Sequence, residues 1–211
     1  MMDMRVQRGL RSRQIILDRA MDIASMEGLE SLSVRRLATE LEVSKSGVFA
    51  QFGSKEELQL ATVRAAIDVF SARVIRPAMK VPAGIRRVRA LSESWMDYAR
   101  QPVFEGGCFF ISTAPEFDTR PGRVRDALAS ARRDWHTLYT TLVTEAQQVG
   151  EILPGIDPAD LAFELDALAR IAAEDAALLD DTPRYDRARR IIAKRLREAA
   201  TDTAEFDRSL S

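Results

Sequence analysis

Apolar residues recur at three- and four-residue spacing along most of this 211-residue chain, a periodicity typical of amphipathic α-helices. The breaks between these segments hold glycine, proline or side chains that cap helix ends. No segment shows the alternation that indicates a strand. The sequence therefore predicts an all-α chain of about nine helices, with a frayed tail after Thr203 and helices over about residues 11–26, 33–41, 44–52, 54–77, 85–100, 108–114, 123–149, 158–180 and 183–203.

Composition excludes several classes of protein. The single cysteine rules out an internal disulfide framework, and with only one histidine the usual cysteine/histidine zinc site cannot be built in one chain. No apolar run approaches the ~20 residues of a membrane-spanning helix, and the N-terminal residues lack the apolar stretch of a signal peptide. We expect a soluble cytoplasmic protein without a cofactor or a metal.

Charge is unevenly distributed along the chain. The formal net charge is −1, but residues 1–13 carry Arg5, Arg8, Arg11 and Arg13 against Asp3 alone. Such a basic arm can follow a phosphate backbone, although many solvated N-termini have the same composition. Residues 54–211 hold 23 basic and 25 acidic side chains, so a second DNA-binding domain is not expected there.

Residues 33–58 predict two short helices that meet across a tight turn. Ser33 and Ser44 are suitable N-caps, and Ser54 with Glu57 has the spacing of a capping box. Ala38 is small enough for the point where the helices cross, and the residues expected to lock their angle are apolar: Leu37, Leu41, Val43 and Val48. A helix pair of this kind places the N-terminal end of its second helix in the major groove of DNA.

The stretch SVRRLATELEVSKSGVFAQFGSKEEL, from Ser33 to Leu58, resembles the DNA-binding segment of the tetracycline-repressor (TetR) family. That family has a capping Thr or Ser, a helix, the pattern V-S-x-[GS]-x-[LV]-[YF]-x-[HY]-F, and then x-[SN]-K-E-x-L. Three positions depart from it. Glu42 stands where the family often has Gly, Phe49 where Tyr is common, and Gln51 where His is frequent.

The resemblance implies which side chains bind double-stranded operator DNA. Ser33 would lie near a phosphate, as helix N-termini do, and Arg35 and Lys45 would contact base edges. The remaining side chains would line the groove or clamp the backbone: Ser44, Ser46, Phe49, Gln51 and Lys55. The alternative is that the serines are only caps and the basic residues only a solvated face.

The resemblance also implies a division into a helix-turn-helix DNA-binding domain with its basic arm (1–53) and a helical ligand-sensing and dimerisation domain (54–211). In the family, the last two long helices pair with those of a second subunit. Two apolar stripes suit such a homodimer interface, namely Leu161, Leu165, Leu168 and Ala172, and Ala188, Ile192 and Leu196. The alternative is that these stripes pack within one subunit.

A pocket for a small apolar effector is expected on the central helices, because such pockets are lined by apolar and aromatic side chains. The candidates are Trp95, Met96, Phe104, Cys108, Phe109, Phe110, Trp135, Tyr139 and Phe163. Each of these residues could equally belong to the core. A nucleophile–base pair of Cys108 and His136 is a competing hypothesis, but no orienting third group is recognisable nearby.

These observations favour a one-component transcriptional repressor, not an enzyme, which an effector releases from a palindromic operator. The alternative is a helix-turn-helix regulator whose C-terminal domain only dimerises or binds a protein partner.

Overall fold

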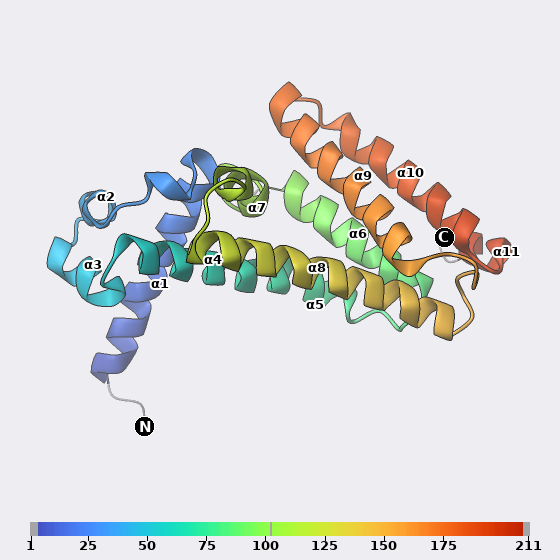
Figure 1. Ribbon diagram of the computed structural model, residues 1–211, viewed down its shortest axis with the longest axis horizontal. Coiled ribbons are helices and arrows are strands. Elements are labelled where there is room, and N and C mark those ends of the chain that lie inside the picture. Colours follow the sequence, from blue (N-terminus) through green and yellow to red (C-terminus); the bar gives the residue numbers. More distant parts are fainter. Residues whose placement is uncertain (1–3, 102, 209–211) are drawn as a thin grey trace. The chain divides into compact units, whose positions relative to one another are not determined.

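The computed structural model describes the backbone of residues 4–101 and 103–208, and the side chains of residues 9–101, 103–204, 206 and 207 (Figure 1). Within these ranges the chain is helical and has no strand, and one isolated antiparallel bridge joins Ile152 to Ala200. The predicted all-α fold is confirmed, with an N-terminal helix-turn-helix followed by a larger helical part.

Six helices are long: α1 (Met4–Glu27), α4 (Lys55–Phe70), α6 (Ile85–Arg100), α8 (Arg123–Gln148), α9 (Pro158–Leu179) and α10 (Pro183–Ala199). The shorter helices are α2 (Val34–Glu40), α3 (Lys45–Phe52), α5 (Arg76–Ala78), α7 (Phe109–Thr113) and α11 (Thr203–Arg208). Leu29–Ser31 and Ala114–Phe117 are 3-10 turns, and the π-helical turn Ser71–Ile75 joins α4 to α5. The π-helical turn comes shortly before Pro77, whose missing N–H interrupts the regular α-helical ladder.

Two helix ends differ from the prediction. α1 begins at Met4 rather than near residue 11, because residues 4–10 contain no proline and are mostly good helix formers. The tail forms α11 rather than fraying, and its first turn is capped by Asp202, which accepts from the N–H of Ala204 (2.8 Å). Phe206 is buried, and Arg197 pairs with Asp207 (2.9 Å). The cap, the buried ring and the ion pair together hold the tail as a helix.

The chain divides into two compact units. The first comprises the described parts of Met1–Val69 and Pro102–Ser130, and the second comprises those of Phe70–Gln101 and Ala131–Ser211. The predicted domain boundary after residue 53 was based on the expected roles of the two parts, not on how they pack, and it stays a prediction.

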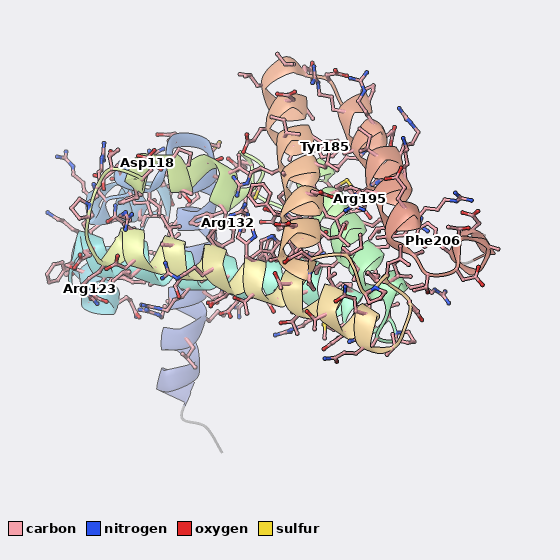
Figure 2. The ribbon with its side chains drawn as sticks, turned by 45° about the vertical axis from the view of Figure 1, so that its right-hand side comes forward. Asp118, Arg123, Arg132, Tyr185, Arg195 and Phe206 are labelled. Carbon is pink, nitrogen blue, oxygen red and sulfur yellow. The ribbon has the colours of Figure 1, made fainter. Side chains whose placement is uncertain are left out.

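In the first unit, α1 packs against α2, α7 and the turn Leu29–Ser31. The buried face of α1 is the one that the spacing predicted, with Ile16, Ala20, Ile23 and Ala24. Arg123, labelled in Figure 2, is the first residue of α8. Its guanidinium forms ion pairs with Glu56 (3.1 Å) and Glu57 (2.6 Å) of α4. The capping box is therefore only half formed: the N–H of Glu57 donates to Ser54 Oγ, but the Glu57 carboxylate pairs with Arg123.

Gly28 ends α1 with a φ of 85°, a conformation that favours glycine. A Cβ on Gly28 would come within 2.4 Å of the Glu116 carboxylate, so a larger residue would be strained at this φ and would displace that carboxylate. That carboxylate accepts from the N–H groups of Leu29 (2.8 Å) and Glu30 (3.1 Å) at the start of the 3-10 turn. Gly28 thus both ends the helix and makes room for the acid that caps the next turn.

In the second unit, α9 and α10 run side by side and both pack against α6 (Figure 1). Asp157 caps α9 by accepting from the N–H groups of Ala159 and Asp160, and Pro158 takes the first helical position, as predicted. Arg195 of α10, labelled in Figure 2, pairs with Glu164 of α9. The two helices are held by a buried apolar seam with ion pairs at its edge.

Candidate DNA-binding site

The turn between α2 and α3 is built from caps and a small buried seam. Ser33 Oγ accepts from the N–H of Arg36 (3.1 Å), and Ser44 Oγ accepts from the N–H of Gly47 (3.0 Å). Leu37, Ala38 and Val48 are buried between the helices, as predicted, and Leu41 is half-buried. These contacts fix the angle at which α3 leaves the turn.

Glu42 occupies the turn with a φ of 54°, the left-handed conformation that the family's glycine would adopt freely. For a residue with a Cβ this conformation costs about 1 kcal/mol. The prediction for Val43 was wrong, because its side chain is 46% exposed rather than part of the seam. Its backbone N–H bonds to the Ala38 carbonyl (3.0 Å), so the backbone of Val43, not its side chain, closes the turn.

The outward face of α3 carries the side chains predicted to enter the groove. Lys45, Ser46 and Phe49 are exposed, Phe49 by 55%, and Ala50, which was not among the predicted residues, is exposed beside them. Val48 and Phe52, on the opposite face, are buried. The structure thus separates a packing face from an exposed face on a helix of only eight residues.

Arg35 and Arg36 are neighbours in α2 with different roles. Arg35 is exposed, and no ion pair is recorded for it among the described residues. Arg36 instead donates to both carboxylate oxygens of Glu27 (2.6 Å each) and to Glu40 (2.8 Å). These hydrogen bonds raise the pKa of Arg36 above its usual value and lower those of the two carboxyls. Of this pair, Arg35 is therefore the residue available to DNA.

Arg13, part of the predicted basic arm, is engaged within the protein. Its guanidinium lies 4.4 Å from the centroid of the Phe52 ring, and its Nη1 donates to the Gln51 carbonyl (2.5 Å). The last carbonyls of a helix have no partner within the helix, and a cation near them is favourable. Arg13 therefore ties α1 to the C-terminal end of α3, a role with no local sequence signal.

The other members of the arm differ from Arg13. Arg11 is exposed. Asp3 and the side chains of Arg5 and Arg8 lie outside the described residues.

Gln51 of α3, which was predicted to line the groove, is half-buried.

Lys55, predicted to contact phosphate, lies at the start of α4. Its Nζ donates to the backbone carbonyl of Glu30 (2.7 Å) and to the Glu30 carboxylate (3.1 Å). An ammonium has three donors, so one donor remains beyond these two bonds. Gln59 also donates to the Glu30 carboxylate (3.1 Å), and with Lys55 it lowers the pKa of Glu30. Lys55 is thus held in place, and one of its N–H donors remains available for a phosphate.

The residues predicted to form the dimer interface lie inside the second unit. Leu168 is half-buried, and the others are buried in a single chain: Leu161, Leu165, Ala172, Ala188, Ile192 and Leu196. This burial favours the alternative that the stripes pack within one subunit. The reason is that α9 is apolar on more than one face, and spacing alone does not distinguish its inner face from its outer face.

A different apolar stripe is exposed on α9. Phe163 (65%), Ile171 (52%) and Leu178 (82%) are exposed at intervals that keep them on one face of the helix, with the exposed Ala167 between them. Ile191 of α10 is exposed as well. Large apolar side chains grouped on one surface are typical of interaction sites.

The residues predicted to line a pocket are divided between the two units. In the second unit, Trp135 packs against Tyr139 (5.4 Å between ring centroids), Trp95 (6.1 Å) and Phe70 (5.1 Å), and Met96 is buried. Phe163 is exposed and stacks on His136 instead.

In the first unit, Phe109 packs edge-on against Phe104 and Phe110, and Cys108 is buried. The pocket itself stays a prediction.

Sequence reasoning missed one buried polar cluster in the second unit. Asp166 of α9 is buried, and its carboxylate accepts from Trp135 Nε1 (2.8 Å) and from Arg132 (2.5 Å), which is labelled in Figure 2. His136 Nε2 lies 3.8 Å from the same carboxylate, and burial is the first cause that lowers the pKa of His136. An acid inside an otherwise apolar stripe was the signal that could have pointed to it.

Comparison with known sequences agrees with this architecture. The profile "Bacterial regulatory proteins, tetR family" matches residues 16–62, and the profile "Tetracyclin repressor-like, C-terminal domain" matches residues 84–192. The second match alone spans more than half of the 211 residues. The chain therefore belongs to the tetR family of bacterial regulatory proteins, which are DNA-binding transcriptional regulators and not a family of enzymes.

Individual relatives are distant. The uncharacterized HTH-type transcriptional regulator YezE of Bacillus subtilis (strain 168) is 22% identical over 103 residues, which are 48% of this chain and 53% of YezE. The match thus spans about half the length of that relative.

Two solved structures share the fold. A TetR transcriptional regulator from Chloroflexus aurantiacus J-10-FL is 23% identical, with a TM-score of 0.85 over 92% of this chain and 98% of that one. AibR, solved in complex with isovaleryl coenzyme A and operator DNA, is 18% identical, with a TM-score of 0.64 over 77% of this chain and 85% of AibR.

Among the described residues, no helix is both long enough and apolar enough to cross a lipid bilayer.

Proposed function

We propose that the protein is a ligand-responsive repressor that binds a palindromic operator in the cytoplasm as a homodimer and is released from it by a small apolar effector. The observation that carries this proposal is the exposed face of α3. Lys45, Ser46 and Phe49 project from a short helix fixed by its Ser44 cap and a buried seam. A major groove accepts one helix, and side chains at its N-terminal end reach base edges.

The electrostatics of this surface favour DNA. α3 contains no carboxylate, and Arg35 and Lys45 are exposed cations. Of the two acids between these cations, Glu40 is neutralised by Arg36 (2.8 Å) and Arg19 (2.6 Å), and Glu42 is exposed in the turn, which leaves the cations in excess. A phosphate backbone therefore meets positive charge here, although the chain as a whole carries a net charge of −1.

The second copy is proposed to pack on the α9 stripe of Phe163, Ala167, Ile171 and Leu178, with Ile191 of α10. These residues are exposed on the last two long helices, the pair from which the sequence predicts the dimer. A twofold interface is self-complementary, so one apolar stripe supplies both sides. Two recognition helices related by such an axis would read the two halves of a palindrome.

The effector is proposed to bind among the aromatic side chains around Trp135. Pockets for small molecules are largely apolar with few polar groups, and this region offers Trp95, Tyr139 and Met96 beside the Asp166 carboxylate. AibR, whose fold is similar, was solved with both an acyl coenzyme A and operator DNA, which supports the same pairing of functions. An unliganded dimer bound to an operator would block RNA polymerase, and for this reason we propose repression.

Selection of bound DNA from a random pool with the full chain tests the DNA-binding part. We expect a palindrome with half-sites about one helical turn, or a multiple of it, apart. Lys45→Ala should weaken binding to the selected site, whereas the matched control Lys80→Ala, an exposed lysine of the second unit, should not. Failure to enrich any sequence would contradict the proposal.

A thermal-shift screen against small molecules tests the effector. A compound that raises the unfolding temperature and also releases the operator supports the sensor. If no compound stabilises the protein while the operator still binds, the protein is instead a regulator without a small-molecule effector.

A further inference from the structure

The exposed face of α3 is unusually apolar for a surface flanked by cations. Phe49 is 55% exposed, whereas Val48 and Phe52 of the same helix are buried. Ala50 beside it is also exposed. The packing of α3 therefore does not use Phe49, and the chain presents a large apolar ring to solvent where a polar residue would be tolerated.

The side chains on this face select among the four bases. In the major groove, Lys and Arg pair with guanine, Asn and Gln with adenine, Asp and Glu with cytosine, and apolar groups contact the 5-methyl of thymine. Among the exposed side chains of α3 there is a lysine and a serine but no amide and no carboxylate. The one amide, that of Gln51, is half-buried on the residue whose carbonyl holds Arg13.

We propose that Phe49 and Ala50 form an apolar contact with thymine 5-methyl groups in each operator half-site, and so determine specificity for thymine next to the base read by Lys45. This inference rests on the proposed DNA-binding function and adds the chemistry of the contacted group. Phe49 has no hydroxyl to donate to a phosphate, so its contribution to binding is through the ring.

Charge argues against a protein partner on the same face. A second protein would have to accommodate Lys45 and Arg35 beside the ring, and in a protein interface buried cations require acidic partners. The floor of a major groove offers the methyl groups, and the phosphates on either side offer the negative charge. The mixed apolar and basic surface of α3 thus complements duplex DNA.

The test replaces each thymine of the selected operator in turn by deoxyuridine, which lacks only the 5-methyl group. We expect wild-type binding to weaken about fourfold at one or two symmetric positions per half-site, the factor that corresponds to about 0.8 kcal/mol for one buried methylene-sized group. Substitution elsewhere in the site should have no effect. This scan needs no variant of the protein, so it cannot be confused by misfolding.

Variants then assign the contact to the ring. Phe49→Ala should remove the difference between thymine and deoxyuridine at the position that the ring contacts, and Phe49→Leu should keep most of it; a difference at a neighbouring position contacted by Ala50 should remain. Ile67→Ala, which truncates an exposed apolar residue of α4, is the matched control and should leave the difference intact.

The possible failures are distinguishable. If no DNA is bound, the proposed function fails and this inference fails with it. If the operator binds and no deoxyuridine substitution weakens it, the inference alone is overturned. A thymine preference that is unchanged at every position in Phe49→Ala overturns the assignment to Phe49.

Discussion

In α3, most of the residues predicted to bind DNA lie at the surface, whereas in α9 and α10 nearly all the residues predicted to bind a second subunit lie inside the chain. Lys45 and Ser46 are exposed on a helix fixed by its caps. Leu165 and Ile192 are buried between helices of one unit. The interface residues were chosen by helical spacing, whereas the DNA-binding residues were chosen by residue-by-residue resemblance to a family motif, which specifies positions directly.

The difference shows what periodicity can and cannot distinguish. A lysine or serine on a short amphipathic helix lies on its solvated face, so polarity identifies Lys45 and Ser46 as exposed residues, although not the exposed Phe49. A helix such as α9 has leucine and alanine on its inner face and Phe163, Ile171 and Leu178 on its outer face. Hydrophobicity is the same on both faces, so core and interface look alike in the sequence.

The largest expected effect tests whether the predicted interface stripe is core. Leu165→Ala should lower the free energy of unfolding by about 2–5 kcal/mol, because it removes buried methyl groups and leaves a cavity. Val149→Ala, at an exposed position of the same unit, should change it by less than about 0.5 kcal/mol. Denaturant titration measures both. If Leu165→Ala keeps wild-type stability but loses dimerisation, the stripe is an interface after all.

The second prediction concerns the exposed stripe. Ile171→Glu should shift the protein from dimer to monomer, with a dissociation constant raised at least about 30-fold, because it places an unpaired charge at the centre of an apolar contact. The control is Leu153→Glu, at an exposed position away from this stripe. Sedimentation velocity across protein concentrations measures the change. A dimer of unaltered affinity in Ile171→Glu would place the interface elsewhere.

Lys45 and Lys55 should differ in how they weaken DNA binding. Lys45→Ala should cost about 1–3 kcal/mol against the selected operator, as expected for a lost base contact. Lys55→Ala should weaken all sequences alike and reduce the slope of log affinity against log salt by about 0.9. Fluorescence anisotropy at several salt concentrations separates the two. Equal losses on operator and random DNA for Lys45→Ala would rule out its role in base recognition.

The smallest effect separates two arginines of the N-terminal helix. Arg13→Ala should destabilise the protein by about 1 kcal/mol, because it loses a cation–π contact and a hydrogen bond to the end of α3. Arg11→Ala should leave stability unchanged, since Arg11 is exposed. Thermal unfolding of the two variants measures this. Similar stability in both variants would mean that the contact of Arg13 with Phe52 and the Gln51 carbonyl does not stabilise the fold.

Several helix caps were predictable from the sequence, and the long-range contacts were not. Ser33, Ser44 and Asp157 cap helices as expected, and Glu42 adopts the left-handed conformation that its position requires. These depend on neighbours within a few residues. The clasp of Arg13 on Phe52 and the burial of Asp166 beside Trp135 join residues more than 30 positions apart. Such contacts are set by packing, so the sequence does not identify the partners; at most, the acid within the apolar stripe of α9 indicated that Asp166 needs one.

The most direct test of the central claim, that α3 reads bases, is to repeat the selection from random DNA with Lys45→Ala. We predict the same palindrome and half-site spacing, with the preference lost at one symmetric pair of positions, where the wild type selects guanine. An identical motif for the wild type and Lys45→Ala would contradict the claim, because the side chain on the exposed face of α3 would then not determine which sequence is bound.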